Sequence, residues 1–549
     1  MFWFSRLGGA PPAVRRLSSP CAHLMTQRRF ALILLAVSLP LAALLLLPVG
    51  YLIVRAGAVE PERAITYLTR PGTLRVAGRS LLLMATVAAA ACAVAIPAAW
   101  LTVRSDLRGQ RAWTVLLTMP LVIPSYVGAL ALVSALGQRG TVRGWLAPLG
   151  VERLPSLYGF WGAWLALTLF SYPYVFLSVR AGLRGLDPAL EEASYTLGRS
   201  QLATFWHVTL RQLLPSISAG ALLVALYTLS DFGAVAIMQY NVFTRAIYLR
   251  LSLDLELAAL LSVVLIALTA GLLAAVALAE RRGTYYTRRT PRPPRRVRLG
   301  RWQAAAQAFC GLVVLLALVA PMGVLALWLV NGLQQGEALR DVLAPLQRSL
   351  RAAGLAAAVS GVAALPFVFL QVRYPGPLTD LLARGAYLGY ALPGVVVGLA
   401  FVFLGANVLH ELGARVGQAD YRSLGLLVFA YTVRFLPQAL GPARASLLQV
   451  NPHLEESALT LGRSYPRALI SVTLPLMRSG VLAGAALVFL TVMKELPITL
   501  LLAPTGYDTL ATRIWSASSE AFYARAAAPA LILVVISALS LVYILEPDG

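Results

Sequence analysis

The chain contains the same polar stretch twice, and this duplication constrains its fold more than any other feature. Residues 187–200 read DPALEEASYTLGRS, and residues 451–464, which begin 264 positions later, read NPHLEESALTLGRS. Each copy lies between long apolar segments. One such stretch alone would suit any loop helix between two membrane spans. Two copies at a fixed offset indicate that the two halves of the chain share one architecture.

Each copy is predicted to form a short helix. Asp187 and Asn451 are good N-cap residues, because a side-chain oxygen can accept hydrogen bonds from free backbone N–H groups. A proline follows each of them at the first helical position, where a missing N–H costs nothing. Paired glutamates come near the first turn, where the helix dipole favours negative charge. Gly198 and Gly462 are then expected to end or bend the helix.

The composition indicates a protein that crosses a membrane many times. Hydrophobic residues make up 59% of the chain, charged residues only 13%, and the mean hydropathy is +0.74. An ordinary soluble protein is therefore excluded. The net charge of +23 comes from arginines that cluster between apolar segments. The positive-inside rule explains this pattern better than nucleic-acid binding does, and we expect no nucleic-acid partner.

Twelve apolar runs are long enough to cross ~30 Å of hydrocarbon as helices. We therefore expect an all-α polytopic membrane protein with 12 transmembrane helices in two groups of six. The expected spans of the first half are 30–54, 78–103, 112–137, 157–179, 213–240 and 257–279. Those of the second half are 303–331, 348–372, 378–405, 422–442, 476–503 and 524–546.

The spans and polar segments divide the chain into four parts. The expected parts are a tail (1–29), a first repeat (30–280) with polar loop 187–211, an Arg/Pro-rich linker (281–302), and a second repeat (303–549) with polar loop 451–475. Charge places both termini, both loops and the linker in the cytoplasm. Since the linker is too charged to enter lipid, we expect it to face solvent and anionic lipid headgroups.

Several kinds of binding chemistry are missing from the sequence. The three cysteines and four histidines are scattered, so neither a disulfide framework nor a zinc motif is visible. The only lysine, Lys494, is followed by Glu495, whereas a P-loop needs Gly-Lys followed by Ser or Thr. We therefore expect no cofactor on this chain, and any ATP and Mg to be bound by partner subunits.

The duplicated loops resemble a known family motif. Residues 192–210, with Glu-Ala-Ser, then Gly198, then Val-Thr-Leu, look like the EAA loop of ABC-importer permeases. The second copy is more complete, because Pro475 closes the pattern where the first copy has Arg211. The first loop is therefore expected to leave its helix differently. The resemblance assigns ATPase coupling to Glu191, Glu192, Ala193, Gly198, Glu455, Glu456, Ser457 and Gly462.

The resemblance implies a type I ABC-importer fold with two fused permease repeats in a bacterial inner membrane. Two ABC ATPase subunits would dock on the cytoplasmic loops, and a periplasmic substrate-binding protein would deliver the cargo to the outer face. The chain itself would be a translocation subunit and not an enzyme. No catalytic motif supports the alternative of a membrane-embedded enzyme. An ion-gradient-driven secondary transporter stays open, although it has no use for the duplicated loop.

A narrower resemblance concerns the cargo. Residues 230–234 (SDFGA), 494–501 (KELPITLL) and 506–511 (GYDTLA) look like segments of fused ferric-iron permeases. This resemblance implies an importer that moves ferric iron from a periplasmic binding protein into the cytoplasm. Importers of the same class for thiamine, phosphonate, sulfate or polyamine are alternatives, because fused permeases for such cargoes share much of the pattern.

Two acidic residues occupy equivalent places inside apolar segments, Asp231 in the first half and Glu495 in the second. An ionisable group at membrane depth is costly and normally faces a cavity or a partner. One hypothesis is that both line the substrate pathway as transient iron ligands, since hard cations prefer oxygen, with Tyr227 adding a further oxygen. The structural alternative is that Glu495 pairs with a cationic neighbour while Asp231 caps a helix that is broken at Gly233.

Overall fold

The computed structural model describes residues 20–138, 140–150, 154–186, 188–251, 253–281, 296–336, 342–406, 422–520 and 522–545. Within these ranges the structure is helical, and the β-structure consists of one isolated bridge between Ser105 and Val297. The predicted all-α class is therefore confirmed for the described part of the chain.

The helices of the first half follow the predicted apolar runs. They are α1 (Pro20–Gly57), α2 (Pro61–Thr69), α3 (Pro71–Arg104), α4 (Gln110–Thr118), η1 (Met119–Val122), α5 (Ser125–Leu136), α6 (Thr141–Leu146), η2 (Ala147–Leu149), α7 (Phe160–Gly185), α8 (Pro188–Thr196), α9 (Gln201–Thr204), the π-helix η3 (Phe205–Thr209), α10 (Leu210–Ser230), α11 (Gly233–Ile237), α12 (Phe243–Arg250) and α13 (Leu255–Arg281).

The second half repeats this order. Its helices are η4 (Gly300–Trp302), α14 (Gln303–Val314), the π-helix η5 (Leu315–Val319), α15 (Ala320–Gln334), α16 (Leu343–Arg373), α17 (Pro377–Ala391), α18 (Gly394–Leu404), α20 (Leu424–Gln449), α21 (Pro452–Thr460), α22 (Tyr465–Ala468), the π-helix η8 (Leu469–Thr473), α23 (Leu474–Leu476), α24 (Arg478–Met493), α25 (Pro497–Leu502), α26 (Leu510–Ser519) and α27 (Tyr523–Leu545).

The expected spans are not all continuous helices. Among the described residues, nine helices are long and apolar enough to cross a membrane, and two further bent pairs raise the count to eleven. Two predicted spans are broken at a proline. The span 112–137 is broken before Pro124, and its two parts meet at 98°. The span 378–405 is broken before Pro393, between α17 and α18. The predicted spans 213–240 and 476–503 end early, at Ser230 and Met493. The count of 12 therefore stays a prediction.

The predicted ends of the repeats also differ in detail. Helix α1 begins at Pro20, so residues 20–29 of the expected tail are helical, while residues 1–19 lie outside the described residues. Most of the expected linker, residues 282–295, lies outside the described residues as well. Its last residues run along the end of α3, where the Val297 N–H donates to the Arg104 carbonyl at 2.7 Å.

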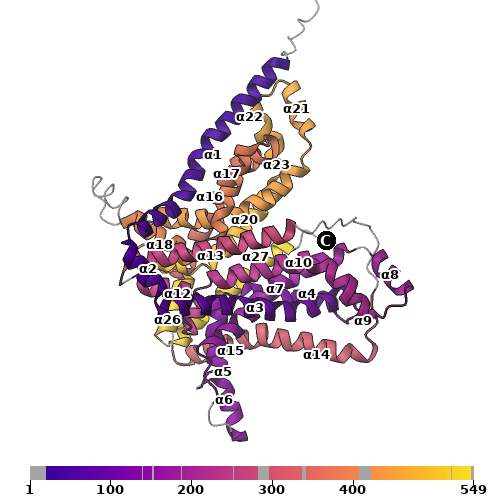
Figure 1. Ribbon diagram of the computed structural model, residues 1–549, viewed down its shortest axis with the longest axis vertical. Helices are drawn as coiled ribbons and strands as arrows, with labels where there is room; N and C mark the ends of the chain where they lie inside the picture. The colour runs from indigo at the N-terminus through magenta and orange to yellow at the C-terminus, as the bar shows by residue number, and fades with distance from the viewer. Residues whose placement is uncertain are drawn as a thin grey trace, which may run out of the picture.

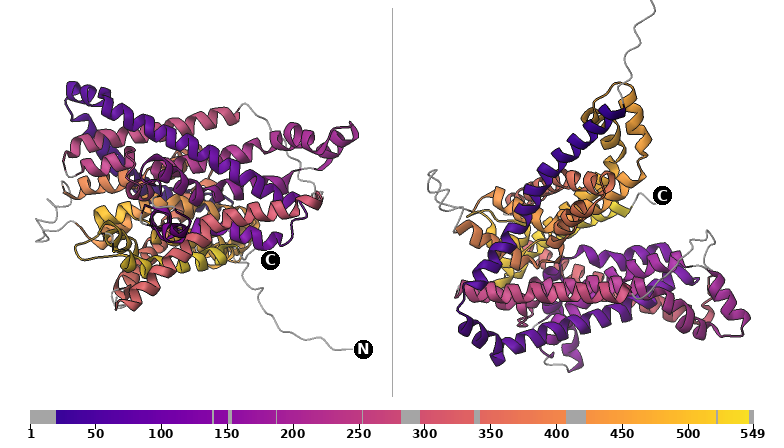
Figure 2. Two further views of the ribbon diagram at one scale, coloured as in Figure 1. Left: turned by 90° about the horizontal axis from the view of Figure 1, so that it is seen from below. Right: turned by 45° about the horizontal axis from the view of Figure 1, so that its top comes forward.

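The helices form two arms that diverge (Figures 1 and 2). One arm contains α3, α4, α7, α10 and α14 and ends at α8 and α9. The other contains α1, α16, α17 and α20 and ends at α21 and α22. Each arm is built on a pair of tightly packed helices, α3 with α7 and α16 with α20. The buried alanines on α3 and α16 let the helix backbones approach closely, as small residues do between membrane helices.

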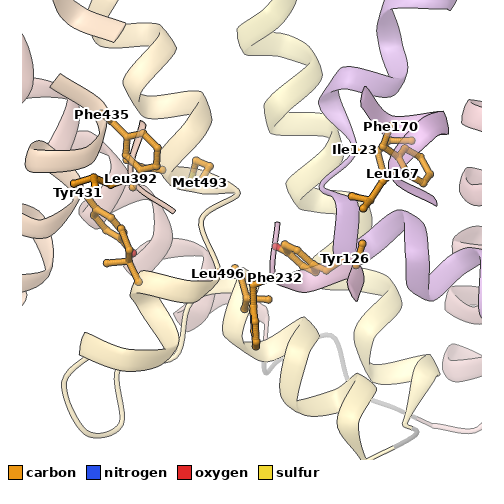
Figure 3. Packing of buried hydrophobic residues seen from close by; sticks show 14 of the residues in the cluster. Ile123, Tyr126, Leu167, Phe170, Phe232, Leu392, Tyr431, Phe435, Met493 and Leu496 are labelled. Carbon is orange, nitrogen blue, oxygen red and sulfur yellow. The ribbon is translucent and has the colours of Figure 1, made fainter. Parts of the chain in front are cut away.

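The first helix of each half packs on the opposite half. Besides its contact with α13, helix α1 lies against α16, α17 and α18 of the second repeat. In the reverse direction, α15 packs against α5 and α14 against α4 of the first repeat. The two repeats are therefore interlocked. A single hydrophobic core runs through both, with Tyr126 and Phe232 of the first half close to Leu496 of the second (Figure 3).

Candidate functional site

The two duplicated loops form the ends of the two arms (Figure 1). Helices α8 and α21 confirm the predicted short helices, and the Asn451 side chain caps α21 by accepting from the His453 N–H at 3.0 Å. Asp187 lies outside the described residues. Gly198 (φ 78°) and Gly462 (φ 83°) adopt left-handed conformations that end the helices, as predicted.

The first glutamate of the first loop lies inside the fold. The Glu191 carboxylate forms an ion pair with Arg104 Nη1 at 3.2 Å and accepts a hydrogen bond from the Thr209 hydroxyl at 2.7 Å. Arg104 is the last residue of α3, and its side chain is 3% exposed. The ion pair therefore fastens α8 to the end of a membrane helix and to the segment that leads into α10.

The second loop repeats this arrangement. The Glu455 carboxylate pairs with Arg373 Nη2 at 2.8 Å and accepts from the Thr473 hydroxyl at 3.0 Å. Arg373 also donates to the Val450 carbonyl at 3.1 Å and ends α16 as Arg104 ends α3. Sequence reasoning missed both arginines. A detectable signal existed, because each arginine directly follows the second predicted span of its repeat.

The second glutamate of each pair faces outward. Glu192 and Glu456 are exposed, as are Ala193 and Ser457. Exposed apolar side chains lie in the same loops as these exposed polar residues. We call these the apolar loop residues, three at matching positions in each repeat: Leu190, Leu197 and Trp206, and Leu454, Leu461 and Ile470. Leu197 is 80% exposed and Leu461 84%, so each helix end presents an uncovered leucine.

The two loops leave their helices differently, as the sequence predicts. A π-helical turn follows in both, η3 in the first half and η8 in the second. Where the first copy has Arg211, the segment 205–230 continues as one membrane-length helix. Where the second copy has Pro475, the helix bends by 68° before α24 begins at Arg478. The bend lies at Met477, just after Pro475, and α10 contains Pro215 without such a break, so the presence of a proline alone does not account for the difference.

Asp231 lies where α10 ends and caps α11. Its carboxylate accepts from the N–H groups of Ala234 at 3.0 Å and Val235 at 3.4 Å, and from the Ser125 hydroxyl. The residue is 7% exposed. The break between α10 and α11 comes ~30 Å along the helix from the duplicated loop, at ~1.5 Å per residue. The helix-capping alternative is therefore the arrangement that the structure contains.

Glu495 takes the matching place in the second half but has a different partner. It forms an ion pair with Arg434 Nη1 at 2.7 Å and accepts from the Ile498 N–H at 3.3 Å. Gly394 occupies the position that matches Ser125 and makes room for this pair, since a Cβ there would lie 2.1 Å from the guanidinium. The buried carboxylate of the first half is therefore satisfied by neutral hydrogen-bond donors, and that of the second half by an ion pair.

Both carboxylates line one cavity of about 190 Å³ between the two halves. Tyr227 and Lys494 line it too, and Lys494 Nζ donates across the halves to the Leu121 carbonyl at 3.1 Å. The structure thus brings together the three predicted pathway residues. Within the described part of the chain, no group of three His, Cys, Asp or Glu side chains could hold a metal ion.

The structure consists of two interlocked helical repeats, and each has an exposed helix–glycine loop at the end of one arm. Side chains of both charges line the cavity between the repeats. These features define a two-repeat membrane permease. The chain belongs to the family of binding-protein-dependent transport system inner membrane components, whose family model matches residues 91–283 and 351–548. The two matches correspond to the two repeats.

Named relatives agree with this family. The chain is 34% identical over 514 residues to the Fe(3+)-transport system permease protein FbpB 2 of Haemophilus influenzae, covering 92% of this chain and 96% of the relative. It is 25% identical over 83% of its length to the putative ferric transport system permease protein FbpB 1 of the same organism. A shorter match, 33% identity over 26% of the chain, is to the molybdenum transport system permease protein ModB of Escherichia coli.

Proposed function

We propose that the chain is the translocation subunit of an ATP-driven importer that carries ferric iron. The observation that carries the proposal is the 34% identity, over 92% of the chain, to a relative named an Fe(3+)-transport system permease protein. Two further relatives that match over more than four fifths of the chain are also named ferric permeases. The family membership supports a binding protein as the source of the cargo.

Each duplicated loop is proposed to dock one ATPase subunit. The apolar loop residues support this role, because uncovered leucines on a short helix are typical of a surface that a partner covers. The buried ion pairs of Glu191 and Glu455 would transmit the movement of a docked subunit into α3 and α16. Glu192 and Glu456, which face outward, would contact the ATPase directly, and Gly198 and Gly462 would hold the helix ends in position.

Orientation in the membrane follows from the same assignment. We place both loops, the linker and both termini in the cytoplasm, where ATP is hydrolysed and where arginine-rich loops accumulate. The Asp231 and Glu495 cavity then lies toward the outer face, from which a periplasmic binding protein would deliver the cargo. The membrane would be a bacterial inner membrane, and ATP and Mg would be bound by the ATPase subunits alone.

The test is reconstitution of the full chain with its ATPase and binding protein in proteoliposomes, with ATP hydrolysis recorded for each loaded binding protein. We expect ferric-loaded binding protein to stimulate hydrolysis and iron to accumulate inside. Stimulation by a sulfate- or molybdate-loaded protein alone would keep the importer and reject iron as cargo. Failure of the ATPase to associate with the chain would contradict the coupling assignment.

A further inference from the structure

Four charged side chains line the cavity between the halves, and their charges cancel. Asp231 and Glu495 supply two negative charges, and Arg434 and Lys494 supply two positive ones. The other lining side chains are apolar or neutral polar groups. A cargo that enters this cavity therefore meets a lining whose formal charge is zero.

The two carboxylates are already engaged with the protein. Glu495 pairs with Arg434 at 2.7 Å, and Asp231 accepts from the Ser125 hydroxyl and from two N–H groups of α11. To ligate iron, either carboxylate would have to give up partners that compensate its burial, at a large cost in free energy. The lining is thus poorly suited to serve as an anionic ligand set for a bare metal ion.

Lys494 is the charged side chain of the cavity that keeps hydrogen-bond donors for a ligand. It is the single lysine of the chain, it lines the cavity, and the described residues give it no ion pair. Its ammonium donates to the Leu121 carbonyl at 3.1 Å, which uses one of three donors. The Tyr126 hydroxyl, also on the lining, is buried without a hydrogen-bond partner among the described residues. Both of these groups can therefore donate hydrogen bonds to a ligand.

A bare trivalent cation fits such a lining badly. Moving an ion out of water is costly unless opposite charge compensates it, and the cost rises steeply with the ionic charge. A nearby ammonium adds repulsion that the low local dielectric strengthens. Oxyanions, in contrast, are the ligands that Lys, Arg and hydroxyl donors bind well.

We propose that iron crosses this cavity as a ferric complex that carries its own oxyanion ligand, a carboxylate or a phosphate, which the Lys494 ammonium contacts. This inference rests on the proposed ferric cargo. The oxyanion neutralises the metal, and the Tyr126 hydroxyl, which is buried without a hydrogen-bond partner among the described residues, adds a further contact. The cavity would thus select its cargo by the anion that is bound to the iron.

The test uses the full chain with its ATPase and its ferric-loaded binding protein in proteoliposomes. One preparation carries ⁵⁵Fe with ¹⁴C-citrate and the other ⁵⁵Fe with ³³P-phosphate, and samples without ATP measure leakage. We expect one of the two anion labels to enter in proportion to the iron and only with ATP. The two arms distinguish a carboxylate from a phosphate ligand.

Two variants separate charge from structure. Lys494→Gln keeps a donor for the Leu121 carbonyl and removes the charge, whereas Lys494→Arg keeps both. We expect Lys494→Gln to lower the uptake of iron and anion together by about tenfold, the value of one charged hydrogen bond, and Lys494→Arg to preserve it. If Lys494 acted only through its hydrogen bond to the Leu121 carbonyl, Lys494→Gln would keep wild-type uptake.

The outcomes are distinct. Iron that enters wild-type vesicles without either label overturns the inference and leaves the ferric importer intact. The inference is also overturned if Lys494→Gln takes up iron and anion at the wild-type level. If ferric-loaded binding protein neither stimulates hydrolysis nor delivers iron, the proposed ferric cargo is contradicted. The inference, which rests on that cargo, is then contradicted as well.

Discussion

The ion pair beneath the second loop makes a quantitative prediction. Glu455 and Arg373 have side chains only 6% and 12% exposed, and Glu455 also accepts from Thr473 at 3.0 Å. Glu455→Ala removes the acceptor of Arg373 and Thr473, so that the buried guanidinium keeps only the Val450 carbonyl and the Thr473 hydroxyl loses its carboxylate. Breaking such a pair costs ~3–5 kcal/mol, and the lower end applies here because the pair lies near the loop surface.

A cost of ~3 kcal/mol raises the local opening constant of the loop roughly 100-fold. Hydrogen exchange of the amides in residues 452–473, measured on the full chain in nanodiscs, reports this constant directly. The matched control is Glu456→Ala, which removes the neighbouring carboxylate with its side chain 61% exposed. That variant is expected to exchange like wild type, since surface ion pairs contribute little.

A double variant tests the reasoning further. Replacing a buried ion pair by apolar residues of similar size is often neutral, so Arg373→Met combined with Glu455→Leu should recover most of the protection that Glu455→Ala loses. Equal exchange in Glu455→Ala and Glu456→Ala would show that the buried ion pair does not stabilise the loop. A double variant no better protected than Glu455→Ala would show that the loss does not come from the unpaired guanidinium.

Three further predictions concern the loops and the cavity. Gly462→Ala should weaken ATPase binding, because alanine in the left-handed conformation of residue 462 costs ~1 kcal/mol, while Gly462→Asn should be tolerated. The affinity of each variant for surface-immobilised ATPase measures this difference. Leu197→Asp and Leu461→Asp should each lower ATPase affinity more than about tenfold with unchanged thermal stability; equal affinity would exclude the exposed leucines from the interface. Gly394→Ala should lower the melting temperature more than Ser125→Ala, since its Cβ would lie 2.1 Å from a guanidinium nitrogen and Ser125→Ala removes only a hydrogen bond; the reverse order contradicts the ion-pair geometry.

Local sequence signals predicted the loops well. The Asn451 cap, the paired glutamates and the helix-ending glycines act within a few residues of one another, so their effect can be read from sequence alone. The difference between Pro475 and Arg211 also predicted that the two loops leave their helices differently, although a proline alone does not account for the bend. The membrane class followed from composition and span length.

Long-range partners could not be predicted. Adjacent glutamates look equivalent in sequence, and only the arginine 87 residues upstream of Glu191 decides which one is buried. Likewise, the neighbours Lys494 and Glu495 point to different partners, a carbonyl of η1 and the guanidinium of Arg434. The break before Pro124 was missed because span length was counted across a proline, although prolines within apolar runs signal such breaks.

The interlocked first helices have a consequence for how the protein is made. Helix α1 leaves the ribosome first, yet three of its packing partners, α16, α17 and α18, are encoded roughly 300 residues later. During synthesis, the surface of α1 that packs on these three helices must face lipid until they are inserted. A chain that stops after the first repeat would therefore leave this surface of α1 facing lipid, without the helices that cover it in the finished protein.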